Sequence, residues 1–370
     1  MKHLFLLLTI ALFSNCTSKP ASTSSEQVTY PGATLPSLTG LISSIEVIRL
    51  QHGDTIMVDD RARLLQRDSS FYLIDISGEQ NIYRFNHDGS FLNKIGQKGR
   101  GPEEYPFLLD IAIEEENDNI FVLSLPDCTI TQYSKAGTFK RKEQINLPAK
   151  GFCKSENRFW IFTGYPDRTL LLQLDDSLHT VDSIRLPQYF TDKMANPLQK
   201  FSTSGEHSYF WRFPFPAIYT LTTDTAQQTT YFNFKDQYIP EKDISERESI
   251  QDKNITSISR YWETNSHILV EIGIVEYKKK TARNIYGLKN KTQNQWYWAE
   301  YTTTPENPFI PDWYPTRTQG FAQDGRLMCF FFGNEIEELT DDARKLITNP
   351  QELENIDPEM DMFILLCRFK

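Results

Sequence analysis

A repeat of about 50 residues is the feature that most constrains how this 370-residue chain can fold. Setting Phe71 against Ile120 aligns two segments at an offset of 49 positions. One residue drops out in a turn, after which the offset is 48 and Gly89 falls on Gly137. Apolar positions and the turn glycine therefore stay in phase through two consecutive units.

Each unit consists of short runs with the composition of β-strands. In the first copy these runs are Phe71–Ile76, Ile82–Phe85 and Phe91–Ile95, and an Asp88-Gly89 turn separates the last two. Several short strands in a unit of about 50 residues are typical of a β-propeller blade and not of a helical array. The sequence therefore predicts an all-β fold, a β-propeller.

Looser copies of the unit fill the rest of the chain. They lie around Arg158–Leu174, Tyr209–Phe232, His267–Trp298 and Arg326–Phe369. Residues 41–370 then form one propeller, with either six blades and insertions or seven blades without them. A polar interval from Pro240 to Lys253 is compatible with a helix or with an inserted loop.

The two ends of the propeller are expected to meet in one blade. The chain closes with an apolar strand, Met362–Phe369, and a short strand pattern occurs near Ile45–Leu50. Sharing one blade closes the ring and avoids an unpaired edge, which would be prone to aggregation. A short helix over Glu335–Ile347 is expected to interrupt the last blade.

The N-terminal 40 residues are expected to lie outside the propeller. Residues 1–15 form a signal peptide whose apolar run, Leu4–Phe13, is too short to span a bilayer. The run ends in Phe13-Ser14-Asn15-Cys16, which resembles a bacterial lipoprotein box with Cys16 as the lipidated residue. The alternative is ordinary secretion, with cleavage of the signal peptide near this position and no lipid attached. Residues 16–40 are rich in Ser, Thr and Pro and are expected to be a flexible tether.

A glycine-rich corner, Ile95 to Tyr105, follows the first unit and reads IGQKGRGPEEY. It resembles the linker of NHL-type repeats and, more closely, the six-bladed β-propeller lipoproteins of Bacteroidetes. The resemblance covers the whole mature chain and selects six blades over seven. It implies a lipid-anchored envelope protein and no assigned reaction. The corner lacks the Gly-Lys-Ser/Thr ending of a phosphate-binding loop, so its glycines more plausibly permit positive φ in a tight passage.

Charge and cysteine content narrow the function classes. The net charge is -10 and no long basic run occurs, which argues against nucleic acid as a partner. Of five cysteines, Cys16 takes the lipid. The other four are far apart and lack Cys-x-x-Cys spacing, so buried free thiols are expected in preference to disulfides: Cys128, Cys153, Cys329 and Cys367.

A metal site at the propeller channel is the enzymatic alternative. Propeller lyases and lactonases of related shape place His or acidic ligands around the central channel. Asp110 is expected to point toward that channel, and His207 and His267 precede comparable strands. No motif for nucleophilic catalysis is present in the sequence.

Bulky aromatic and arginine residues in loop-like, proline-bearing stretches are the best candidates for ligand contact. Such residues dominate binding hot spots, and aromatic faces suit sugar rings. Packing between blades is the structural alternative for the same residues. Together with Asp110, the candidates are Trp211, Arg212, Trp262, Trp313, Tyr314 and Arg317.

The sequence as a whole favours a non-catalytic lipoprotein anchored to the outer membrane, on its periplasmic or surface face. The propeller is expected to act as a binding or scaffold module, because closed rings offer variable loops on a rigid frame. The expected partner is a glycan, a peptide or an envelope protein. The protein is expected to be a monomer without a cofactor, touching the membrane through its anchor alone. The alternative is a metal-dependent lyase or hydrolase centred on the channel.

Overall fold

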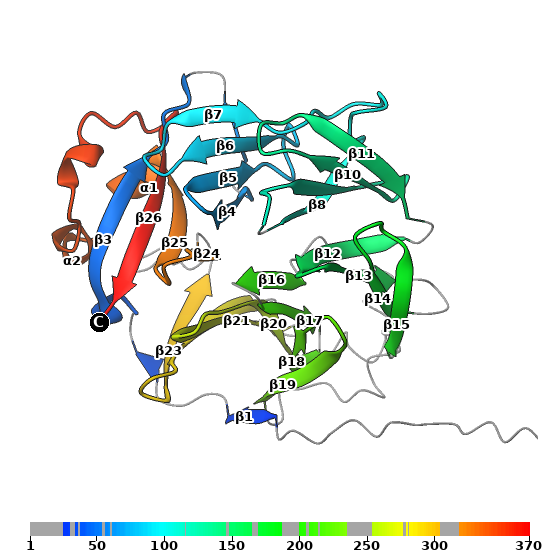
Figure 1. Cartoon of the computed structure of the whole chain (residues 1–370). Helices are drawn as coiled ribbons and strands as arrows, with labels where there is room; N and C mark the ends of the chain where they lie inside the picture. The colour runs from blue at the N-terminus through cyan, green and yellow to red at the C-terminus, as the bar shows by residue number, and fades with distance from the viewer. Residues whose placement is uncertain are drawn as a thin grey trace, which may run out of the picture.

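The computed structural model describes residues 25–29, 34–35, 38–53, 56–59, 61–114, 116–145, 148–164, 169–186, 200–204, 207–213, 215–234, 254–276, 279, 281–303 and 318–370. Their strands form six sheets that stand around a common axis as the blades of one β-propeller (Figure 1). The predicted fold class is therefore confirmed: the chain is nearly all-β, with six blades and short helices near the C-terminus.

Blades 1 to 3 follow one another along the chain, each with four antiparallel strands and its first strand innermost (Figure 1). Blade 1 is β4 (Arg63–Arg67), β5 (Ser70–Ile74), β6 (Ile82–Asn86) and β7 (Phe91–Lys94). Blade 2 is β8 (Leu108–Ile113), β9 (Ile120–Ser124), β10 (Thr129–Tyr133) and β11 (Phe139–Gln144). Blade 3 is β12 (Ala149–Ser155), β13 (Arg158–Gly164), β14 (Thr169–Leu174) and β15 (Thr180–Leu186).

Blades 4 to 6 complete the ring with the same strand order from the axis outward. Blade 4 is β16 (Phe201–Ser204), β17 (His207–Arg212), β18 (Phe215–Leu221) and β19 (Ala226–Asn233). Blade 5 is β20 (Asn254–Glu263), β21 (His267–Glu276), β22 (Thr281–Asn290) and β23 (Gln295–Thr303). Blade 6 is β24 (Thr318–Phe321), β25 (Leu327–Phe332), β26 (Met362–Phe369) and the N-terminal strand β3 (Ile42–Arg49).

The turn glycines of the repeat have a structural reason in both copies. Gly89 and Gly137 have φ values of 85° and 83°, a region that L residues with side chains rarely adopt. A Cβ on Gly89 would collide with the carbonyl oxygen of Arg49, and one on Gly137 would lie 2.5 Å from that of Lys94. Each glycine thus lets its hairpin turn press against the outermost strand of the preceding blade.

Ring closure matches the prediction from the sequence. The N-terminal strand β3 pairs antiparallel with β26, so that Ile48 lies opposite Ile364. Six hydrophobic clusters among the described residues each lie between two neighbouring blades, and one of them joins blade 6 to blade 1 through Ile48, Phe330 and Phe71. The core is therefore a closed series of blade-to-blade interfaces, and apolar burial there drives closure.

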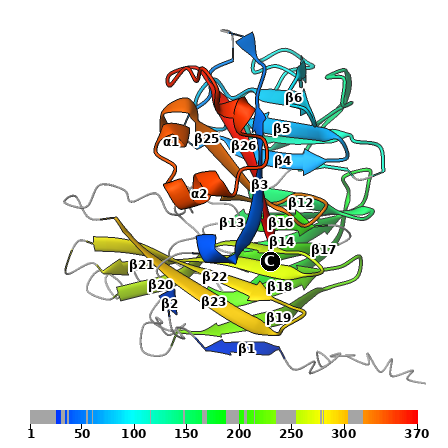
Figure 2. The ribbon, with the colours of Figure 1, turned by 90° about the vertical axis from the view of Figure 1, so that its left-hand side faces the viewer.

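An insertion between β25 and β26 covers the outer edge of β3 (Figure 2). The prediction of one helix over Glu335–Ile347 is wrong, because a second helix begins inside this segment. The Thr340 hydroxyl caps that helix by accepting a hydrogen bond from the Ala343 amide at 3.3 Å. The amide of Asn349 exchanges hydrogen bonds of 2.9 and 2.7 Å with the backbone of Val47 in β3. The insertion contains α1 (Gly333–Glu337), α2 (Asp341–Lys345) and a 3-10 turn (Pro350–Leu353).

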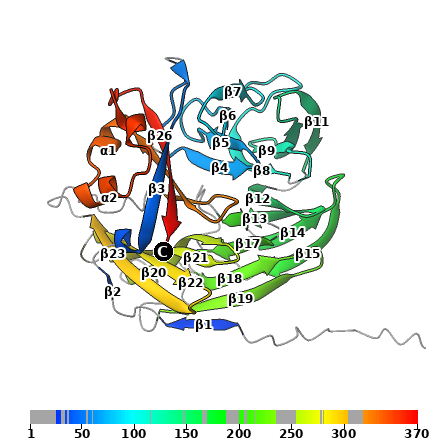
Figure 3. The same ribbon diagram turned by 60° about the vertical axis from the view of Figure 1, so that its left-hand side comes forward.

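Part of the expected tether lies on the propeller. Strand β1 (Glu26–Thr29) pairs in parallel with β19, and β2 (Thr34–Leu35) pairs in parallel with β23 (Figure 3). The expectation of a flexible spacer is wrong for these residues, because the outer edges of blades 4 and 5 supply backbone partners. A 3-10 turn (Thr39–Leu41) leads into β3. Residues 1–24, including Cys16, and the interval Pro240 to Lys253 lie outside the described residues.

The cysteines described by the structure are free thiols, as expected. Cys153, Cys329 and Cys367 are buried in blade interfaces, and Cys128 is partly exposed. Burial raises the pKa of the Cys153 thiol well above its ordinary value. The three buried cysteines therefore act as small apolar core residues.

Candidate functional site

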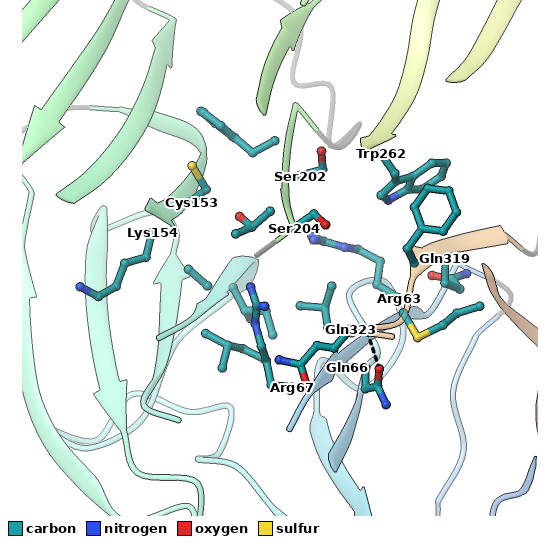
Figure 4. A pocket seen from close by; sticks show the side chains of 18 of the residues that line it. Arg63, Gln66, Arg67, Cys153, Lys154, Ser202, Ser204, Trp262, Gln319 and Gln323 are labelled. Carbon is teal, nitrogen blue, oxygen red and sulfur yellow. Dashed lines mark hydrogen bonds between the residues drawn. The ribbon is translucent and has the colours of Figure 1, made fainter. Parts of the chain in front are cut away.

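The channel on the propeller axis holds a narrow cavity of about 90 Å³ (Figure 4). All six innermost strands contribute to its wall, so it lies where the blades converge. One residue from each of β4, β8, β12, β16, β20 and β24 illustrates the lining: Arg63, Asp110, Phe152, Ser202, Trp262 and Gln319.

Asp110 links three blades at the channel wall. Strand β8 bulges between Leu108 and Asp110, a device that redirects a side chain locally. One carboxylate oxygen of Asp110 accepts from the Arg63 guanidinium at 2.6 Å, and the other accepts from the Phe152 amide at 3.1 Å. The two side chains of the ion pair are 20% and 15% exposed, so water screens the pair only weakly.

Further polar contacts join the remaining blades around the channel. The Ser208 hydroxyl of blade 4 donates to the Lys154 carbonyl of blade 3 at 3.4 Å. The Arg260 guanidinium of blade 5 donates to the Thr318 carbonyl of blade 6 at 3.2 Å. The Leu64 amide of blade 1 donates to the side-chain oxygen of Gln319 in blade 6 at 3.0 Å. Polar side chains near the axis therefore fasten neighbouring blades to one another.

The backbone of Lys154 lies at the channel, but its ammonium group points away from the channel. Figure 4 shows its side chain directed away from the cavity. The ammonium, on a side chain 4% exposed, lies 3.2 Å from Glu114 and 2.7 Å from Asp176. Burial works against ionisation of Glu114, but hydrogen bonds from Asn119 and Lys154 outweigh it and hold the pKa of Glu114 below its usual value.

The cavity is small for a catalytic or ligand pocket. Pockets for small molecules usually enclose about 300–1,000 Å³. Among the residues that the structure describes, no group of three His, Cys, Asp or Glu side chains gathers as metal ligands. The groups that contact the Asp110 carboxylate are the Arg63 guanidinium and the Phe152 backbone amide. Both are hydrogen-bond donors, which suit an ion pair and are not metal ligands. The described part of the channel is thus a small space lined in part by an ion pair and its backbone amide partner.

The glycine corner carries a second, open hollow of about 510 Å³, lined in part by Lys94, Glu103 and Tyr133. The corner runs from β7 to β8 and is held by one of its own side chains and by one from β10. The Glu104 carboxylate accepts from the Gly101 amide at 2.8 Å, and the Tyr133 hydroxyl donates to the Glu103 carbonyl at 2.6 Å. The Gly101 amide, which a bound phosphate would need as a donor, already donates to Glu104. The corner therefore acts as a passage between blades.

The predicted ligand-contact residues fall into three groups. Asp110 and Trp262 line the channel cavity. Trp211 and Arg212 lie in strand β17, and both are buried. The Trp211 indole donates to the Ser259 carbonyl at 3.3 Å, and the Arg212 guanidinium lies 5.8 Å from the ring centre of Phe162. A third group lies outside the described residues: Trp313, Tyr314 and Arg317.

The loop assignment of two aromatic stretches is wrong. Trp211 is the penultimate residue of strand β17, and Trp262 lies within the innermost strand β20. Both side chains pack between blades, because their strands present aromatic residues to the next sheet. Whether any of these residues contacts a ligand stays a prediction.

The two histidines do not occupy positions comparable to Asp110. His207 and His267 open β17 and β21, which are second strands of their blades and not innermost strands. The His267 ring lies 4.7 Å from the ring of Phe369, and burial lowers the pKa of the imidazole. Strand order within a blade thus separates these histidines from the channel wall.

Arg63 and Gln319 line the channel but were not predicted from the sequence. Both lie at or near the start of an innermost strand and hold a neighbouring blade through a polar contact. A polar residue at or near the start of an innermost strand is the signal that would have revealed them. The looser spacing of the later units hides that position.

A family model places the chain among related proteins. It matches residues 33–368 and is described as a domain of unknown function, DUF4934. The chain belongs to the DUF4934 family. Among the described residues of this DUF4934 propeller, no helix has the length and apolar character needed to cross a membrane.

Two solved structures are similar to the DUF4934 propeller. A candidate exported protein of Bacteroides fragilis NCTC 9343 has a TM-score of 0.71 and 17% identity, over 93% of this chain and 99% of that chain. A DUF4221 family member of Bacteroides vulgatus ATCC 8482 has a TM-score of 0.49 and 9% identity, over 89% of this chain and 97% of that chain. No curated protein matches the chain in sequence. The likeness to the first structure shows a shared fold.

Proposed function

We propose that this DUF4934 protein is a non-catalytic binding or scaffold module of the cell envelope. Its propeller presents a surface to a glycan, a peptide or an envelope protein. The observation that carries the proposal is the construction of the channel. Three of its described polar side chains, Arg63, Asp110 and Gln319, hold neighbouring blades together around a cavity of about 90 Å³.

A ring built in this way favours binding over catalysis. Catalysis needs reactive groups placed around a substrate-sized space, and the described channel uses its ion pair for blade contacts. A closed propeller is rigid, because each blade packs on two neighbours. Rigid frames keep the entropy cost of association low, which suits a recognition surface on the rim or the faces.

Location in the cell envelope fits this role. The lipobox-like Phe13-Ser14-Asn15-Cys16 supports lipid attachment at Cys16 and anchoring to the outer membrane. The structural likeness to a candidate exported protein of Bacteroides fragilis supports export of this chain as well. The resemblance of the glycine corner to NHL-type repeats and to Bacteroidetes lipoproteins belongs to the same proposal.

Metal content separates the binding module from the enzymatic alternative. We expect the purified protein to hold no stoichiometric calcium or zinc, and a chelator to leave its thermal unfolding midpoint unchanged. Stoichiometric metal that is lost in Asp110→Ala would contradict the proposal. Asp182→Ala, on the exposed strand β15, is the matched control for that variant.

A cross-linked pull-down from native envelopes tests the binding role directly. We expect one envelope component to be recovered in stoichiometric amount with the intact protein and in reduced amount with Cys16→Ala, which removes the proposed anchor. Membrane fractionation of both forms shows separately whether Cys16 holds the protein in the membrane. Recovery of no specific component, together with turnover of a substrate by the purified protein, would overturn the proposal.

A further inference from the structure

The outer edge of blade 4 carries a strand that the blade does not need. Blade 4 already has four strands, β16 to β19, like blades 1 to 3. Strand β1 adds to it as a fifth, pairing in parallel from Glu26 opposite Thr230 to Thr29 opposite Asn233 (Figure 3). Addition of an extended segment to an exposed sheet edge is a common way of binding a peptide.

An acidic residue of β1 meets a buried lysine beside this edge. Lys289 of β22 in blade 5 donates to the Glu26 carboxylate at 2.6 Å. The Lys289 side chain is 9% exposed and its ammonium lies 5.9 Å from the ring centre of Trp296. Without Glu26 this largely dehydrated charge would lose its carboxylate, and an unpaired buried charge is strongly unfavourable. The position therefore selects an acidic side chain.

A single apolar side chain anchors β1 two residues further on. Val28 is 4% exposed and belongs to the cluster between blades 4 and 5, with Phe232, Phe234 and Trp298. Its neighbours Gln27 and Thr29 are exposed. A β-branched residue suits this place because it has a strand conformation and fills a small apolar site.

The edge that β1 covers differs from edges that lie open. Among the described residues no strand adds to the outer edge of β11, which carries Lys140, Arg141, Lys142 and Glu143, and charges of this kind discourage strand addition. The outermost strand of blade 4, β19, has the sequence AQQTTYFN and no charged residue. Blade 4 thus presents an edge suited to accept another strand.

We propose that the outer edge of β19, together with Lys289 and the apolar site of Val28, is a peptide-binding groove. Its ligand is an extended segment, added in parallel, with an acidic residue followed two positions later by a β-branched residue. Residues 26–29 are its built-in occupant, and a segment of this pattern from an envelope protein takes their place. The inference rests on the proposed binding function and assigns it a site and a ligand class.

The built-in segment is suited to act as a displaceable occupant. It contributes one buried side chain and one ion pair, and the four strands of blade 4 remain complete without it. Tethering gives such a segment an effective concentration of about 1 mM, so a free peptide competes poorly while the segment is docked. Weakening the docked segment should therefore open the groove.

Binding of a peptide with the sequence of residues 24–30 to the full chain tests the groove. The probe is fluorescently labelled SSEQVTY, and the protein is either unaltered or carries Val28→Asp, which places a charge in the apolar site. Fluorescence anisotropy should show binding to the Val28→Asp protein that is about tenfold to hundredfold tighter than to the unaltered protein. Probe peptides with Val28→Asp or Glu26→Lys should not bind to either.

Hydrogen exchange at the amides of residues 26–29 makes each outcome decisive. We expect protection in the unaltered protein and its loss in the Val28→Asp protein. Loss of protection without peptide binding would overturn the proposal, as would fast exchange in the unaltered protein or retained protection in the variant. Equal binding of all probe peptides would indicate non-specific adhesion and would also overturn it.

Failure of this test is distinguishable from failure of the proposed function. A full chain that recovers an envelope component equally well with and without Val28→Asp would bind it elsewhere on the propeller. The binding function would then stand and the groove would not. Dimers formed by exchange of residues 26–29 between copies, detected by light scattering, would make a second copy the occupant and would contradict a foreign peptide.

Discussion

Arg63 and Asp110, 47 residues apart in the chain, form an ion pair of 2.6 Å that joins the innermost strands of blades 1 and 2. The second carboxylate oxygen of Asp110 accepts from the Phe152 amide in blade 3. One side chain therefore holds three consecutive blades at the channel wall. This relationship makes the polar channel a structural element of the ring.

Replacing Asp110 by Asn should destabilise the propeller. The variant loses the charge that neutralises Arg63, and hydrogen bonds to charged groups contribute about 2 kcal/mol each. We expect the free energy of unfolding to fall by about 2 kcal/mol in urea titrations, with an unchanged slope against urea concentration. Asp182→Asn on the exposed strand β15 should change it little. Equal stability of both variants would show that the ion pair makes no net contribution.

The glycine corner should depend strongly on Gly96. Its φ is 60°, and an added Cβ would lie 2.6 Å from the ring of Tyr133. Gly96→Ala should therefore lower the free energy of unfolding by about 2 kcal/mol, because the backbone is strained and the ring must move. Gly40→Ala is the control, since nothing lies within 4 Å of its added Cβ. Thermal unfolding of both variants measures the difference, and equal midpoints would contradict this account of the corner.

The contribution of Glu114 should depend on pH. Its pKa is held below the usual value in the folded protein, because hydrogen bonds from Asn119 and Lys154 outweigh burial. A lowered folded-state pKa stabilises the protein above the unfolded pKa of about 4.3, and this stabilisation is lost as pH falls through the folded pKa. Glu114→Gln should be about 1 kcal/mol less stable than the unaltered protein at pH 7, and this difference should shrink as pH falls from the unfolded pKa through the folded pKa.

Urea titrations between pH 7 and pH 3.5 measure this difference. The exposed Glu143→Gln on the outermost strand β11 is the matched control, and its stability difference should stay flat. A Glu114→Gln difference that grows toward low pH would reverse the sign expected here and contradict the hydrogen-bonded carboxylate.

Thiol reactivity should follow burial. In a Cys16→Ala protein we expect one fast-reacting thiol, Cys128, because it is partly exposed. Cys153, Cys329 and Cys367 are buried, and the pKa of Cys367 is raised by its hydrogen bond with Cys329 and by burial. Thiolates are the reactive form, so these three should react with a thiol reagent after unfolding. Mass spectrometry of labelled peptides identifies the sites, and fast labelling of native Cys153 would refute its burial between blades 3 and 4.

The repeat and its turns were predictable because they depend on local chemistry. Nearly continuous apolar runs fix strands such as β5 and β9, which are buried on both faces between neighbouring blades. Glycine at positions 89 and 137 fixes the hairpin turns, because few other residues adopt positive φ. The closing pair of β3 and β26 followed from the need to pair the free edges at the two chain ends.

Aromatic residues showed where the sequence is ambiguous. Trp211 and Trp262 lie among prolines or charged neighbours, a composition shared by loops and by strand ends. Their burial depends on which sheet faces them across a blade interface. The spacing of residues along the sequence does not show which sheet that is. The candidate site depended on the same information, since Asp110 was expected at the channel but its partners Arg63 and Phe152 were not.

The sequence by itself determined the units of this protein: period, strands, hairpin turns, glycine corner and the two strands that close the ring. These features depend on residues close together in the chain or on the free edges at its ends. Only the tertiary structure decided which polar groups hold the channel and that residues 26–29 dock on blade 4. Such contacts join distant segments through side-chain fit and charge, for example Glu26 with Lys289, and parallel addition to a sheet edge requires no sequence repeat.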